Sequence, residues 1–111
     1  MAEERMMEER LTALRTKISE ITGDMAASAA AGDWGTTHDL GDLRLNLLEA
    51  LIAGVDDPRE EVALIEQILS SDRKLKTLAV KCRAEVVVEL NAHQRRGEAA
   101  RSYLDAASTD C

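Results

Sequence analysis

The first part of the chain carries apolar residues at alternating steps of four and three. These positions are Met7, Leu11, Leu14, Ile18, Ile21 and Met25. On a helix that turns about 100° per residue they lie within an arc of roughly 80°, which leaves the rest of the surface polar. The pattern predicts a helix that ends at Gly32 and packs along one narrow seam.

A second helix is predicted over residues 34–54. Asp33 is a suitable N-terminal cap, and Gly54 followed by Asp56, Asp57 and Pro58 marks the end. The apolar side chains of this helix cover roughly 200° of its circumference, far more than an ordinary surface helix presents. They are Leu40, Leu43, Leu45, Leu47, Leu48, Leu51 and Ile52. One neighbouring helix cannot bury an arc of this width.

A third, long helix is predicted over residues 59–95. Asp57, Pro58 and two following glutamates form a strong helix start, because they combine a cap, a proline at the first position and favourable charge at the helix dipole. Its apolar residues again cover about 200°. After Gly97, a short apolar face predicts a separate final helix; its members are Ala99, Ala100, Tyr103 and Leu104.

Short connections near residues 32 and 56 make consecutive helices antiparallel. We therefore expect an all-α protein, an antiparallel up-down-up helical bundle of three helices with a short C-terminal fourth helix. Its 111 residues suit one domain over 1–111, with 98–111 as a short, mobile helix and tail. The second helix is shorter than its neighbours, so the far half of the third must pack on the first helix, the C-terminal segment or another chain.

Two charged residues fall on the apolar arcs. Arg44 lies near the middle of the second helix's arc and Asp72 near the middle of the third's, where an unpaired charge is costly. Counting outward from the connection at residues 56 and 57 places Arg44 within one helical turn of Asp72, so a structural ion pair is expected. The alternatives are that either side chain contacts a partner or simply faces solvent.

Composition narrows the function. The balance of 45% hydrophobic and 32% charged residues, with one Pro and no Phe, favours helices. A net charge of −7 argues against direct nucleic-acid binding. No signal peptide or membrane-spanning run is evident, which indicates a cytoplasmic protein without membrane insertion. Because no nucleotide loop, nucleophile elbow or metal-ligand pattern occurs, we expect no enzyme activity, catalytic residue, cofactor or metal site.

Trp34 allows two interpretations. Tryptophan is enriched at binding hot spots, so Trp34 could anchor a partner. A single Trp beside a helix start is more often a plug at the end of a bundle.

Three stretches carry a resemblance to a known family: AAAGDWGTTHDLGDLRLNLLEAL, ALIEQILSSDRKLKTLAVKCRAEVVVEL and HQRRGEAARSYL. Over roughly residues 11–105 the chain resembles the FliT family of flagellar export chaperones. The shared residues are Gly32, Asp33 and Trp34, then Arg44 with Leu47 and Leu48, then Ile68, Leu69 and Asp72, then Ala100 and Tyr103. Gly41 and the valine run 86–88 depart from the family pattern.

The resemblance implies a chaperone of flagellar type III secretion. Such a protein binds the C-terminal region of the filament-cap protein, keeps it unpolymerised and delivers it to the export apparatus and its ATPase complex. Some members also bind the flagellar master transcription activator and restrain it. The last helix of the family is thought to fold over the binding surface and move aside for partners.

The residues themselves also call for a cover over the wide apolar arcs. Our expected partner-binding residues on the second and third helices are Leu43, Leu47, Leu51, Ile65, Leu69 and Val87. The expected autoinhibitory cover consists of Ala99, Ala100, Tyr103 and Leu104. The alternative is a structural helical module without chaperone activity, whose excess apolar surface forms an obligate homodimer interface.

Overall fold

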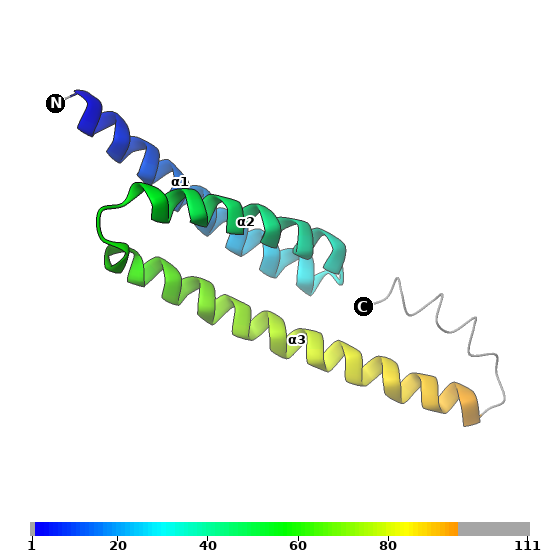
Figure 1. Cartoon of the computed structure of the whole chain (residues 1–111). Helices are drawn as coiled ribbons and strands as arrows, with labels where there is room; N and C mark the ends of the chain where they lie inside the picture. Colours follow the sequence, from blue (N-terminus) through cyan, green and yellow to red (C-terminus); the bar gives the residue numbers. More distant parts are fainter. Residues whose placement is uncertain (1, 96–111) are drawn as a thin grey trace.

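A computed structural model describes residues 2–95, apart from the side chain of residue 93 (Figure 1). Three α-helices and one short 3-10 helix make up nearly all of this range: α1 (Ala2–Ala30), α2 (Trp34–Gly54), η1 (Pro58–Glu61) and α3 (Val62–Arg95). Between residues 2 and 95 there is no strand, which confirms the all-α prediction. The expected short helix within 98–111 lies outside the described residues.

The connection between α1 and α2 follows from three consecutive residues. Gly32 has a φ of 78°, a conformation that a residue without Cβ adopts easily. The backbone N–H of Gly32 donates to Ala29 O at 3.0 Å and that of Asp33 to Ser28 O at 2.9 Å, the Schellman arrangement that ends a helix. Asp33 then caps α2 by accepting a hydrogen bond from the Thr36 N–H at 3.1 Å. The chain therefore reverses direction within three residues (Figure 1).

The connection between α2 and α3 is built in a similar way. The Val55 N–H donates to Leu51 O at 3.1 Å and closes α2. The Asp57 carboxylate accepts from the Arg59 N–H at 3.0 Å, and Pro58 occupies the first helical position. Because η1 leads directly into α3, the predicted long helix is continuous and begins with one 3-10 turn.

The core is thin and centred on α1. A cluster of four buried residues from all three α-helices forms its middle: Leu11, Ile18, Leu51 and Ile68. The narrow stripe of α1 packs against both α2 and α3, whereas the backbones of α2 and α3 approach each other less closely. The molecule is accordingly a rod of 73 × 20 × 18 Å. No helix within residues 2–95 covers the outer flanks of α2 and α3, where several large apolar side chains are exposed.

The helices overhang each other at both ends of the rod. Figure 1 shows the first turns of α1 and the last turns of α3 projecting beyond α2. Met7, the first member of the predicted α1 seam, is therefore exposed, while Leu11 is buried. None of the described helices is long and apolar enough to cross a membrane.

Candidate protein-binding surface

A buried arginine ties the three α-helices together. The side chain of Arg44 is 10% exposed, and its Nη2 donates to both carboxylate oxygens of Asp72 on α3, at 2.9 and 3.0 Å. Its Nη1 donates to Thr22 Oγ1 on α1 at 3.4 Å, and that hydroxyl in turn donates to Ile18 O at 2.8 Å. The structure thus brings Arg44 and Asp72 into the direct contact that the sequence predicts. Because the Asp72 side chain is 43% exposed, the pair reaches from the core to the surface.

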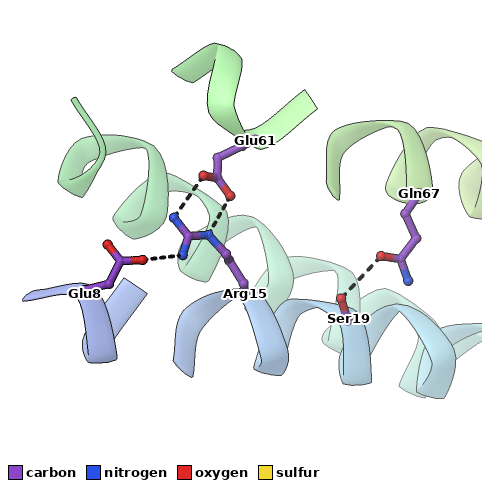
Figure 2. A network of polar contacts seen from close by, with 5 residues as sticks. All are labelled: Glu8, Arg15, Ser19, Glu61 and Gln67. Atoms are coloured by element: carbon purple, nitrogen blue, oxygen red, sulfur yellow. Dashed lines mark hydrogen bonds and ion pairs between the residues drawn. The ribbon is translucent and has the colours of Figure 1, made fainter. Parts of the chain in front are cut away.

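A second ion pair holds the beginning of α3 against α1 (Figure 2). Glu61, 3% exposed, accepts hydrogen bonds from Arg15 Nε at 2.8 Å and from Arg15 Nη2 at 3.1 Å. Arg15 also contacts Glu8 at 3.3 Å, and Ser19 donates to Gln67 Oε1 at 3.3 Å further along the two helices. The hydrogen bond to Glu61 raises the pKa of Arg15.

Sequence reasoning did not find this second pair. It interpreted Glu61 only as a favourable charge at a helix start. The signal available was the spacing, because Glu61 lies seven residues before the buried Ile68 and therefore on the same face of the helix. A carboxylate in such a position needs a partner when it is buried.

The predicted partner-binding residues differ in exposure. Leu43 is 43% exposed, Leu69 49% and Val87 48%. Leu47 and Ile65 are half-buried. These five remain accessible to another molecule to different degrees.

Leu51 does not belong to this set, and its assignment to a binding surface was wrong. It is 0% exposed and lies in the central cluster. The physical reason is its spacing of seven residues from Arg44, which puts both side chains on the face of α2 that α1 and α3 close over.

Exposed apolar residues lie on both α2 and α3. Leu69 lies three residues before Asp72, on the same side of α3. Trp34 of α2 lines a pocket with residues of α3, and at about 100° per residue Leu45 lies roughly 20° from Trp34 around α2, whereas Leu43 lies roughly 180° from it. Leu45 and Leu69, both exposed, therefore border the side on which α2 and α3 meet, and Leu43 lies on the other flank of α2.

A pocket of about 310 Å³ extends this surface towards the end of the rod. Trp34 at the start of α2 forms one wall. The other lining residues come from α3 and are Ala79, Cys82, Arg83, Val86 and Val87. Trp34 is half-buried against α3 and borders this pocket, so both interpretations of Trp34, a partner anchor and a plug at the end of the bundle, stay predictions.

The remaining predicted residues lie elsewhere. The expected cover, Ala99, Ala100, Tyr103 and Leu104, is outside the described residues. Within the described part of the chain, no group of three or more His, Cys, Asp or Glu side chains is arranged to hold a metal ion.

Comparison with known proteins gives one result. The model of the family described as flagellar protein FliT matches residues 7–105, which is most of the chain. Comparisons with curated proteins and with solved structures find no match. The match covers α2, α3 and all but the first five residues of α1, and it includes Arg44, Asp72 and the exposed leucines. The chain therefore belongs to the FliT family of flagellar proteins, a family of export chaperones.

Proposed function

We propose that this protein is a cytoplasmic chaperone of flagellar type III export that binds the C-terminal region of the filament-cap protein. It keeps that protein unpolymerised and delivers it to the export apparatus and its ATPase complex. The observation that carries the proposal is the exposed apolar surface on α2 and α3, with Leu45 and Leu69 beside the Arg44–Asp72 pair and the Trp34 pocket next to it. A chaperone needs such a surface to be available to its partner.

Binding follows from the shape of this surface. An amphipathic helix of the cap protein can lay its apolar face along α2 and α3, as in other helix-in-groove complexes. Each Å² of apolar area removed from water contributes roughly 25 cal/mol, so a few leucine and valine anchors suffice for useful affinity. The same apolar residues of the cap protein are then unavailable for contacts between its own copies, which prevents premature assembly.

The C-terminal segment supplies a removable cover. The proposed cover, Ala99, Ala100, Tyr103 and Leu104, has only two large side chains, so as a short helix it would bury little area in comparison with a leucine-rich helix. A partner that presents larger apolar residues can displace it at modest cost. Deletion of residues 98–111 is therefore expected to raise the affinity for the cap protein.

Regulation of flagellar gene expression, if present, acts through protein contact. The chain has a net charge of −7 and so lacks the field that attracts a phosphate backbone. We infer that the activator, where the protein restrains it, occupies the same apolar surface as the cap protein. Cap protein and activator are expected to compete.

The test compares neighbouring residues of equal type that differ in the side of the helix they occupy. Leu45→Ser and Val87→Ser alter the side of each helix that borders the Trp34 pocket, whereas Leu43→Ser and Val88→Ser alter exposed residues on another flank of the same helix. Calorimetric titration with the C-terminal region of the cap protein should show weaker binding for the first two variants only. Equal effects of both sets, or no binding by the unaltered chain, would contradict the proposal.

The alternative function, a structural module that forms an obligate homodimer, makes a different prediction. The exposed leucines and valines would then be buried between two copies. Sedimentation at several protein concentrations distinguishes the two. A monomer at micromolar concentration whose affinity for the cap protein rises on deletion of 98–111 supports the chaperone, and a dimer that never dissociates supports the module.

A further inference from the structure

One flank of α3 carries exposed residues at alternating steps of four and three. We name these eight residues the α3 stripe: Val62, Glu66, Leu69, Arg73, Lys76, Val80, Arg83 and Val87. At about 100° per residue they lie within an arc of roughly 100°. This spacing is that of a coiled-coil seam, yet every member is exposed in the structure.

The α3 stripe is basic in an acidic protein. Its three cations, Arg73, Lys76 and Arg83, form no ion pair with any residue between 2 and 95. Ion pairs elsewhere in the described part of the chain involve Arg15, Lys17, Arg44 and Arg59. The three cations of the stripe outnumber its one acid, Glu66, so the stripe is positively charged in a chain whose net charge is −7.

The stripe leads into the apolar pocket. Arg83 and Val87 belong to the stripe and also line the 310 Å³ pocket beside Trp34. The pocket can receive one bulky apolar side chain from a helix that lies along the stripe. Between Leu69 and Val87 the stripe runs roughly 27 Å, which is about five turns of a partner helix.

We propose that the α3 stripe is a docking site for an acidic amphipathic helix of the partner protein. Leu69, Val80 and Val87 contact the partner's apolar seam, and the cations face Glu or Asp residues beside that seam. The inference rests on the proposed function, because it defines the chemistry of the partner that this surface selects. The positive charges of the stripe favour a partner helix with acidic side chains over a neutral or basic one.

A second copy of the chain is the competing occupant. If the stripe packed antiparallel on itself about its middle, Leu69 would face Val80 and Glu66 would face Arg83. Arg73, however, would face Lys76 in an unfavourable like-charge contact at the centre. The outcome of the experiment below decides this point as well.

The probe is a synthetic three-heptad peptide with leucine at the seam positions and glutamate beside them. A matched peptide has lysine in place of each glutamate. Binding to the full chain is followed by fluorescence anisotropy at about 0.05 and about 0.5 M salt. The protein's overall charge repels the glutamate peptide and attracts the lysine peptide, so binding of the former reports the stripe and not the general field.

Two pairs of variants separate the stripe from unspecific charge effects. Lys76→Glu and Arg83→Glu change the stripe, whereas Lys74→Glu and Lys81→Glu make the same type of change two residues away, turned by roughly 160° around the helix. The first pair is expected to weaken glutamate-peptide binding about tenfold, the second pair less than about twofold. High salt should weaken binding by the unaltered chain. Circular dichroism confirms that each variant is folded.

Three results would overturn the proposal. The first is no binding of the glutamate peptide to the full chain, which includes the case in which the chain's own tail occupies the stripe. The second is an equal loss in both pairs of variants. The third is self-association of the chain that Lys76→Glu alters in either direction, because the stripe would then belong to a second copy.

The same variants distinguish this inference from the proposed function. Binding of the cap protein that Lys76→Glu leaves unchanged would reject the acidic-helix inference and leave the chaperone function intact. Binding of the glutamate peptide with the expected pattern, without any binding of the cap protein, would support the stripe and reject the proposed partner.

Discussion

The two partners of the Arg44–Asp72 pair should contribute unequally to stability. Arg44 is almost fully enclosed, whereas water reaches Asp72. Asp72→Asn leaves a buried guanidinium without its counter-charge, and Arg44→Met leaves a carboxylate that water can solvate while a flexible apolar side chain fills the space. We therefore expect Asp72→Asn to be the more destabilising of the two changes.

The magnitudes follow from the burial of each group. Breaking a fully buried pair costs about 3–5 kcal/mol, and an exposed pair is worth about 0–1 kcal/mol. Hydrogen bonds to a charged group contribute about 1.5–3 kcal/mol. Because the Asp72 carboxylate is partly exposed, we expect Asp72→Asn to lower the free energy of unfolding by an amount in this intermediate range. Arg44→Met should cost less than about 1 kcal/mol.

Urea unfolding followed by circular dichroism measures these differences. For a domain of this size, about 2 kcal/mol corresponds to a decrease in Tm of about 10 °C. The double variant should be about as stable as Arg44→Met alone, because the asparagine no longer faces an unpaired cation. As a control, Lys17→Met alters an exposed pair with Glu20 and should change stability by less than about 0.5 kcal/mol. An Asp72→Asn variant as stable as Arg44→Met would refute this reasoning.

Three further predictions concern the scaffold. Gly41→Ala should stabilise the protein by about 0.5–1 kcal/mol, because a Cβ there would lie 3.4 Å from the nearest side chain, which is an ordinary contact. Gly54→Ala should destabilise the protein, because a Cβ there would lie only 2.9 Å from the nearest atom. Thermal melts in which both variants shift the Tm in the same direction would contradict this pair of predictions. Leu51→Ala should cost about 2–5 kcal/mol in urea unfolding, and a cost under about 1 kcal/mol would be inconsistent with its place in the core. Hydrogen bonds from the Thr36 side chain and backbone lower the pKa of Asp33, so the ionised carboxylate stabilises the folded protein above about pH 4, and this stabilisation is lost as the pH falls through the folded-state pKa. Asp33→Asn can still cap the helix but does not titrate, so the Tm of this variant should fall less in acid. A Tm that falls equally in acid for both proteins would contradict this role of Asp33.

Local sequence determined the helices and where they end. The bounds of α2 were predictable because Asp33 and Gly54 act on their own neighbourhood, through a cap and a chain break that need no tertiary contact. The Arg44–Asp72 contact was also predictable, because a short connection fixes the register of two consecutive helices. The family was recognisable for the same reason, since its motifs lie at these caps and charged positions.

Tertiary structure decided which apolar side chains are covered. An arc of roughly 200° shows that a helix is apolar on two sides, but not which side its neighbour occupies. Leu51 and Leu43 belong to the same predicted arc, yet one is buried and the other exposed, because α1 and α3 close over one face of α2 and leave its other flanks open. Arg15 and Glu61, 46 residues apart, meet only through that same packing. Periodicity along a chain reports the faces of one helix, whereas the position of a second helix depends on the packing of the whole core.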